Sequence, residues 1–236
     1  MTRPEALGQR SWPELEGRSI TALVPVGAVE QHGPHLPLDT DTRIATSVVA
    51  AALARRGDPD LLSAPELSYG ASGEHEGFAG TVSVGHDALG RILVEYGRSA
   101  CRWAHRVLFV NGHGGNAETV RSAVTQLRDE GRDVAWFPCT FADADAHAGH
   151  TETSVLLHLS PDLVRADRIV AGNRAPIAEL LPALRSGGVA AAGPTGILGD
   201  PTTATAADGE RLFDDLVGRL ADRVGGWIVD ARGLLT

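Results

Sequence analysis

Short apolar runs alternate along this chain with longer segments in which apolar residues recur at helical spacing. The short runs are typical of strands buried on both faces of a sheet, and strands are predicted at residues 20–26, 61–64, 107–110 and 134–137. Helices are predicted at residues 11–14, 42–56, 87–103, 118–128, 151–159, 175–185 and 208–228. This alternation predicts an α/β fold, with a mostly parallel central sheet and helices on both of its faces.

Two segments lack this periodicity and are predicted to be loops. Residues 65–85 hold several glycines and few apolar pairs, which indicates a long loop with one short strand at residues 81–84. A loop of that length inside a compact domain is usually functional. Residues 186–207 are rich in Gly, Ala and Thr and indicate a second loop region. Nothing resembles a linker, so one domain is predicted over residues 1–236.

Several predicted helices have recognisable ends. Ser11 and Glu14 have the spacing of a capping box at the start of a short helix. Asp41 or Thr42 is expected to cap the helix that follows them, and Gly57 to end it.

Composition and charge exclude several classes of partner. The hydrophobic content of 43% and charged content of 22% are those of an ordinary soluble protein. The net charge of −9, without any basic run, argues against nucleic acid and anionic membranes. The N-terminus lacks the apolar core of a signal peptide, and no apolar stretch approaches the roughly 20 residues of a membrane span. A cytoplasmic protein is therefore expected, with Cys101 and Cys139 as free thiols and one disulfide bridge as the alternative.

Possible metal ligands crowd into the segment that follows the first predicted strand, at Glu30, His32, His35, Asp39 and Asp41. Carboxylate and imidazole suit zinc, manganese or ferrous iron. Glu30 and His32 would point the same way on an extended segment, and Asp41 could fold back from a helix start. The prolines at 34 and 37 favour a rigid, pre-organised loop. The alternative is a polar turn with solvated histidines and a helix cap.

Two further motifs carry candidate chemistry. Residues 111–116 follow a predicted strand and place His113 among glycines, which is compatible with a metal loop, a phosphate-binding loop or a tight turn. Residues 147–154 place Glu152 in a first helical turn behind His147, where a structural Glu favoured by the helix dipole is the alternative. Loops that follow parallel strands meet at one edge of the sheet, so the motifs are expected to converge. No Ser or Cys nucleophile motif is present, which argues against covalent hydrolysis.

The three motifs, together with residues 73–81, occur in the order and spacing of the creatininase family, which the chain resembles over nearly its whole length. The resemblance implies a three-layer αβα hydrolase that acts on amide or peptide C–N bonds with two divalent ions, zinc and/or Fe(II), with manganese as a further candidate. It implies Asp41 as the bridging ligand. The implied metal ligands are Glu30, His32, Asp41, His113 and Glu152. The implied catalytic residues are His147, as base or substrate-orienting residue, and Glu152.

One departure and four closer matches bear on the substrate. Creatinine-hydrolysing members carry Tyr-Glu where this chain has Gly114 and Gly115, so creatinine is not the expected substrate. Four stretches resemble the mycofactocin-system branch of the family, at residues 69–75, 94–99, 145–152 and 198–205. This resemblance implies a peptide substrate, the mycofactocin precursor, and release of its C-terminal Val-Tyr-derived part. Substrate contacts are predicted at His75, Gly114, Gly115 and His150.

The resemblance also implies a homo-oligomer, with a hexamer as one form found among relatives. Three alternatives stay open from the sequence. A small-molecule amidohydrolase or deformylase of the same family would share the metal ligands. A non-catalytic metal- or peptide-binding protein, or a phosphate-binding α/β module, would use the same loops without this chemistry.

Overall fold

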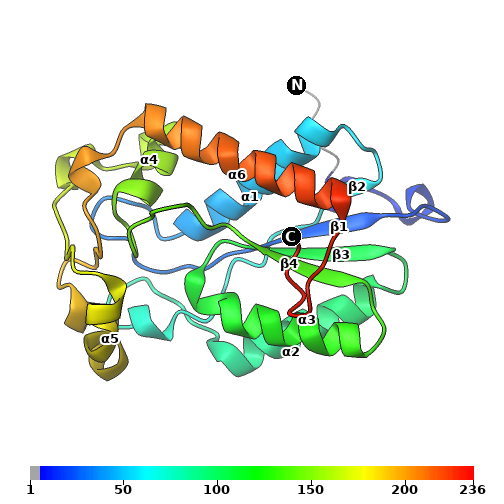
Figure 1. Cartoon of the computed structure of the whole chain (residues 1–236), viewed down its shortest axis with the longest axis horizontal. Coiled ribbons are helices and arrows are strands. Elements are labelled where there is room, and N and C mark those ends of the chain that lie inside the picture. Colours follow the sequence, from blue (N-terminus) through cyan, green and yellow to red (C-terminus); the bar gives the residue numbers. More distant parts are fainter. Residues whose placement is uncertain (1–5) are drawn as a thin grey trace.

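Four parallel strands form the centre of the molecule, in the order β2–β1–β3–β4 (Figure 1). The computed structural model describes residues 6–236. The strands are β1 (Thr21–Val26), β2 (Leu61–Ser63), β3 (Arg106–Asn111) and β4 (Val134–Pro138). Every residue of β1 is buried, as expected of a central strand with helices on both faces. The predicted α/β class and parallel sheet are confirmed.

Five helices cover the two faces of the sheet (Figure 1). Three of them pack on one face: α1 (Thr40–Arg56), α4 (His150–Leu159) and α6 (Ala206–Gly226). The other face is covered by α2 (Gly85–Ala100) and α3 (Ala117–Asp129). Strand side chains alternate between the two cores, so Leu23 joins the first core and Val24 the second. These are the three αβα layers that the resemblance implied.

A sixth helix, α5 (Ile177–Ala192), lies at the end of the molecule where the strands terminate (Figure 1). It packs against a short 3-10 helix, η3 (Gly73–His75). The other 3-10 helices are η1 (Leu7–Gln9), η2 (Trp12–Glu14), η4 (Gly114–Asn116), η5 (Pro161–Leu163), η6 (Ala166–Arg168) and η7 (Pro201–Thr203). The predicted capping box is present at η2, where Glu14 accepts the Ser11 N–H at 2.8 Å.

The order of the strands marks the carboxyl ends of β1 and β3 as the expected place for a ligand. The chain leaves β1 toward β2 on one side, and later places β3 on the other side of β1. In parallel sheets, ligands bind where the connections that leave two neighbouring strands go to opposite sides. Val26 and Asn111 are paired at the carboxyl ends of β1 and β3. Residues 27–39 and 112–116 start from this point, so both ligand-rich loops begin side by side.

Most predicted element boundaries are confirmed within a few residues, but the start of α1 is different. The helix begins at Thr40, with Asp39 at the capping position, so neither Asp41 nor Thr42 is the cap. Asp41 is inside the first turn, where its side chain points to the sheet edge and not to the helix end. Gly57 ends the helix in a left-handed conformation (φ 61°), as predicted.

Two loop predictions were wrong in part. Residues 81–84 form no strand, and only an isolated bridge joins Val82 to Val29. The segment predicted as loop from residue 186 instead continues α5 to Ala192, after a break at Gly187 and Gly188. The glycines indicated a loop, but Gly188 (φ 65°) serves a close approach, because a Cβ there would lie 2.4 Å from the carbonyl oxygen of Glu74. Pro182 lies in the first of the two helical segments, shortly before the break, as predicted.

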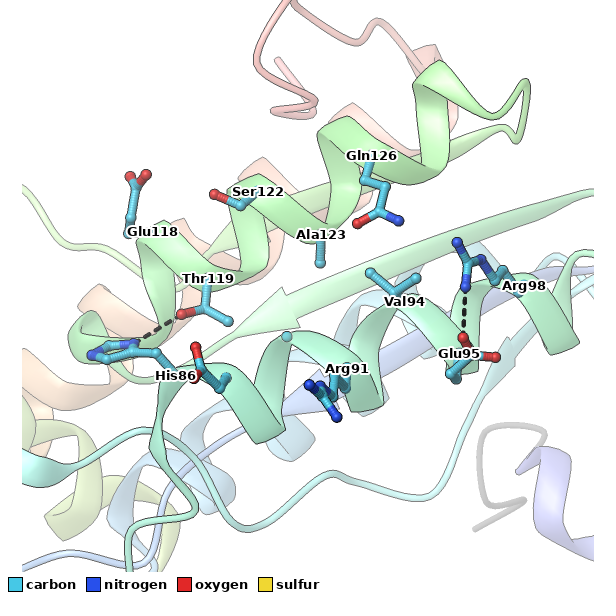
Figure 2. Close-up of a pocket in the computed structure, with 12 residues that line it drawn as sticks. His86, Arg91, Val94, Glu95, Arg98, Glu118, Thr119, Ser122, Ala123 and Gln126 are labelled. Atoms are coloured by element: carbon cyan, nitrogen blue, oxygen red, sulfur yellow. Dashed lines mark hydrogen bonds and ion pairs between the residues drawn. The ribbon is translucent and has the colours of Figure 1, made fainter.

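Other surface features lie away from the carboxyl ends of the strands. A groove of about 770 Å³ runs between α2 and α3, with Val94 and Ala123 in its floor and Arg98 and Glu118 at its rim (Figure 2). Cys101 and Cys139 are free. Within residues 6–236, no helix is both long and apolar enough to cross a membrane.

Candidate metal centre

The loop after β1 carries buried polar side chains to the sheet edge. Glu30 and His32 are both fully buried, and the Glu30 N–H bonds the Leu38 carbonyl at 2.9 Å, which closes the loop. The imidazole of His32 is oriented by its Nδ1, which lies 3.1 Å from the backbone oxygen of Glu30 and donates to it. This contact leaves His32 Nε2 facing the interior of the cluster, which is the arrangement expected of a metal-binding histidine.

Three buried residues form what we call the first half-site: Glu30, Asp41 and His113. His113 Nε2 lies 3.2 Å from Glu30 Oε2, and His113 Nδ1 lies 3.3 Å from Asp41 Oδ2. One ligand atom from each residue falls within 4.8 Å of the others. Residues from the loops after β1 and β3 and from the first turn of α1 thus meet at the switch between the strands.

His32, His147 and Glu152 form the second half-site, and their candidate ligand atoms also lie within 4.8 Å of one another. His32 Nε2 is 3.2 Å from Asp41 Oδ1 and 4.0 Å from Glu152 Oε2. The two oxygens of Asp41 therefore face the two half-sites, one each. This geometry is the one that a bridging carboxylate requires.

The turn before α4 brings His147 and Glu152 to the cluster. The carboxylate of Asp145 accepts backbone N–H bonds from His150 and, at 3.1 Å, from Thr151. Glu152 Oε2 accepts the N–H of Ala148 at 2.6 Å, and Ala148 has a positive φ of 52°. The predicted place of Glu152 in the first turn is confirmed. Besides its favourable interaction with the helix dipole, the Glu152 carboxylate stabilises the turn that holds His147.

Gln31 is a hub that the sequence analysis did not single out. Its amide nitrogen donates to His75 Nδ1 at 2.9 Å and to the Gly196 oxygen at 3.0 Å, and its backbone oxygen accepts from His147 Nε2 at 2.8 Å. His75 in turn lies beside the first half-site, with Nε2 3.2 Å from Glu30 Oε1. A buried amide next to a candidate ligand was the available signal, but only tertiary structure shows that Gln31 joins segments more than 100 residues apart.

The other residues near the cluster have different surroundings. His35 Nε2 bonds the Thr153 hydroxyl at 2.8 Å and so ties the first loop to α4. Asp39 is at the surface, where its Oδ1 accepts from Arg43 Nε at 2.7 Å. His150 Nδ1 lies 2.9 Å from the Thr203 hydroxyl, outside the cluster. His35 therefore connects the first loop to α4, whereas Asp39 lies outside the cluster.

The charges of the cluster are balanced by protons on its imidazoles. Burial alone would lower the pKa of His32, but the Asp41 and Glu152 carboxylates outweigh it and raise that pKa to about 10. Burial likewise opposes the charge on His113, yet Asp41 and Glu30 raise its pKa well above the ordinary value. Burial would raise the pKa of Asp41, and the two histidines hold it below its usual range. A divalent ion would take the place of these protons.

His147 and Glu152 differ from the other residues of the cluster. Burial, together with the charge on His32, lowers the pKa of His147 well below its ordinary value, so its ring is neutral. Burial raises the pKa of Glu152 to about 7, despite the opposing effect of His32. The raised pKa lets the Glu152 carboxyl take up or release a proton near neutral pH, while the neutral ring of His147 keeps a lone pair that can accept a hydrogen bond.

The residues present fit a divalent metal centre. Among the described residues, both carboxylate oxygens of Glu30 and Oδ2 of Asp41 are buried without a hydrogen-bond partner. Buried carboxylates are costly unless a charge compensates them, and a cation held between them would do so. The donors are carboxylate oxygens and imidazole nitrogens, a set that suits zinc, iron and manganese.

An α/β sheet with such a cluster at the carboxyl ends of its strands is the arrangement of a metal-binding hydrolase. The chain matches the model of the creatininase family, described as creatinine amidohydrolase, over residues 8–224. It is 60% identical over 236 residues to the mycofactocin precursor peptide peptidase of Mycolicibacterium smegmatis, covering 99% of this chain and 96% of the relative. It is 31% identical over 204 residues to the creatinine amidohydrolase of Pseudomonas putida, covering 72% of this chain and 77% of that one.

The fold agrees with these relatives. The solved structure of creatininase with Mn superimposes with a TM-score of 0.79 at 27% identity, covering 93% of this chain and 97% of that chain. The chain therefore belongs to the creatininase family. It is accordingly a hydrolase of carbon–nitrogen bonds.

Proposed function

We propose that this chain is a metal-dependent peptidase that hydrolyses an amide bond of the mycofactocin precursor peptide. The observation that supports this substrate is the 60% identity, over almost the full length of both chains, to a relative named for that activity. The similarity to creatinine amidohydrolase is about half as high and covers less of the chain, so a small cyclic amide is the less favoured substrate.

The proposed centre holds two divalent ions. Glu30 and His113 would hold one, His32 and Glu152 the other, and Asp41 would contribute one oxygen to each. When bound, zinc, Fe(II) or manganese would lower the pKa of a water molecule and polarise the scissile carbonyl. The buried oxygens of Glu30 and Oδ2 of Asp41 support this assignment, because they accept no hydrogen bond and have only imidazole nitrogens near them to balance their charge.

His147 is the proposed proton-transfer residue. Its Nε2 lies 2.8 Å from the backbone oxygen of Gln31, which can only accept, so Nε2 carries a proton. In the neutral ring the lone pair is then on Nδ1, where a proton can be taken up and passed to the leaving amine. The candidate ligand atoms of Glu152 and His147 lie within 4.8 Å of each other, so Glu152 is proposed to share in this transfer as well as to bind metal.

The remaining assignments concern the substrate and the assembly. Release of the C-terminal Val-Tyr-derived part is proposed for the cleavage. His75, Gly114, Gly115 and His150 remain the proposed substrate contacts, and His150 would act from the outer side of α4, where its ring meets Thr203. The whole chain is proposed to work as one domain in a cytoplasmic homo-oligomer.

The test is a substrate panel with the purified protein, loaded separately with Zn²⁺, Fe²⁺ and Mn²⁺. The modified precursor peptide, creatinine and a set of formamides are incubated under identical conditions, and the products are identified by mass spectrometry. We expect cleavage of the peptide only, abolished by chelation and restored by added metal. Turnover of a formamide or cyclic amide with no cleavage of the peptide would replace this function with that of a small-molecule amidohydrolase.

A further inference from the structure

A carboxylate that belongs to neither half-site lies against His113. Glu74 is in η3, and its Oε1 is 3.5 Å from His113 Nε2. The same nitrogen lies 3.2 Å from Glu30 Oε2, so His113 stands between two carboxylates from different segments. The side chain of Glu74 is 34% exposed, whereas that of Glu30 is fully buried, which places Glu74 on the open side of the cluster.

The backbone of Glu74 is held in position from two sides. Inside η3, the N–H of His75 bonds the Ser72 oxygen at 3.0 Å. From outside, α5 packs onto η3 where Gly188 approaches the Glu74 carbonyl so closely that a Cβ would lie 2.4 Å from its oxygen. The backbone from which Glu74 reaches His113 is therefore fixed by the fold.

Gly115 supplies the space that this carboxylate occupies. A Cβ at Gly115 would lie 2.4 Å from His113 Nε2, 2.5 Å from Glu74 Oε1 and 2.8 Å from the Ala71 oxygen. Any side chain there would displace either the imidazole or the carboxylate. The neighbouring Gly114 is different, since a Cβ there would meet nothing within 4 Å. Of these two adjacent glycines, only Gly115 is required by the contact between Glu74 and His113.

We propose that Glu74 supplies a further carboxylate to the first half-site, next to His113, and strengthens the binding of the ion held there. The inference rests on the metal-dependent function proposed above. Its physical basis is the negative charge of Glu74 at the open side of the ion's position and its contact with a ligand imidazole. Carboxylates that contact ligating histidines typically change metal affinity by about 10- to 100-fold.

The direct test compares Glu74→Gln with Glu76→Gln, an exposed Glu two residues along the same loop. Metal-free proteins are titrated with Mn²⁺ alone, and bound ions are counted by elemental analysis. We expect Glu74→Gln to weaken the binding of one of two ions by about 10- to 100-fold and to leave the affinity for the other unchanged. Glu76→Gln should bind as wild type. Wild-type affinity for both ions in Glu74→Gln, or equal weakening in Glu76→Gln, would overturn the proposal.

A second pair of variants tests the space beside His113 without changing any charge. Gly115→Ala should disrupt the contact between Glu74 and His113 by displacing one or the other, and should weaken binding of the same ion, whereas Gly114→Ala should bind both ions as wild type. If the two alanine variants bind alike, Gly115 has no role in the contact and the proposal loses its geometric support. A wild-type protein that binds no Mn²⁺, and no Zn²⁺ or Fe²⁺ when the titration is repeated with those ions, would instead refute the proposed metal-dependent function, so the two failures are distinguishable.

Discussion

The two half-sites are built from different parts of the fold. Every residue of the first comes from the sheet edge or the first turn of α1, and the Glu30 and Asp41 side chains are 0% and 3% exposed. The second depends on His147 and Glu152, which arrive with a later turn and helix, and the Glu152 side chain is 22% exposed. The first half-site is thus pre-built by the core, and the second depends on a later segment and contains the more exposed carboxylate. We expect metal affinity to depend mainly on the first and turnover on the second.

A variant of Asp41 should affect both metal affinity and turnover, because its two oxygens face both half-sites. Asp41→Ala is expected to remove both ions and all measurable turnover. Elemental analysis and a peptide-cleavage assay on the same preparation check this. Asp39→Ala is the matched control, since Asp39 is a surface carboxylate paired with Arg43 and should keep both metal and activity. An active, metal-free Asp41→Ala protein would refute the two-ion centre.

A variant of His147 should separate metal binding from turnover. His147→Ala is expected to keep both ions and to lower kcat by about 10²- to 10⁴-fold, the usual contribution of a positioned acid–base group. His158 lies in α4 and packs against Phe213, so His158→Ala should leave kcat unchanged. Loss of bound metal in His147→Ala would mean that His147 is a ligand and not the proton-transfer residue.

Metal removal should reveal how much the core depends on the ions. An ion present at 100 times its dissociation constant adds about 2.7 kcal/mol to the free energy of unfolding. For a chain of this size, this corresponds to a rise of roughly 5–10 °C in Tm. Calorimetry with and without chelator measures the shift, and Asp41→Ala should show none. A wild-type Tm that does not respond to metal would argue against a pre-built first half-site.

The smallest expected effect concerns the support of α4, which carries Glu152. Gly209 of α6 packs so closely on α4 that a Cβ would lie 1.9 Å from the Ser154 oxygen. Gly209→Ala is expected to lower the free energy of unfolding by roughly 1–3 kcal/mol, measured by urea denaturation. In Gly218→Ala, on the same helix, the Cβ meets only the flexible end of Arg55, so stability should be unchanged or slightly higher. If Gly209→Ala weakens metal binding more than turnover, the division between the half-sites is wrong.

Local sequence patterns predicted the structure correctly where the burial or conformation of a residue follows from its neighbours in the chain. The apolar runs became parallel strands, and Gly57 ended α1 because a left-handed residue was needed there. The prediction failed at residues 186–192, where glycines indicated a loop. Gly188 instead breaks α5 to bring it onto Glu74, and such a contact between distant segments has no local signature.

The candidate site shows the same limit. Glu30, His32, Asp41, His113, Glu152 and His147 could be proposed from three motifs, because ligand residue types and loop positions are visible in the chain. Gln31 and Glu74 were not singled out, since their roles depend on which atoms they meet across the fold.

By itself, the sequence determined the α/β fold, the loops that carry the ligands and the family to which the chain belongs. These follow from periodicity and from motifs whose residues are near neighbours in the chain. Tertiary structure alone decided how those loops meet: Asp41 between two half-sites, Gln31 between two histidines, and Glu74 in the space left by Gly115. The physical reason is that these contacts join segments separated by many residues, and packing, not local preference, sets their distances.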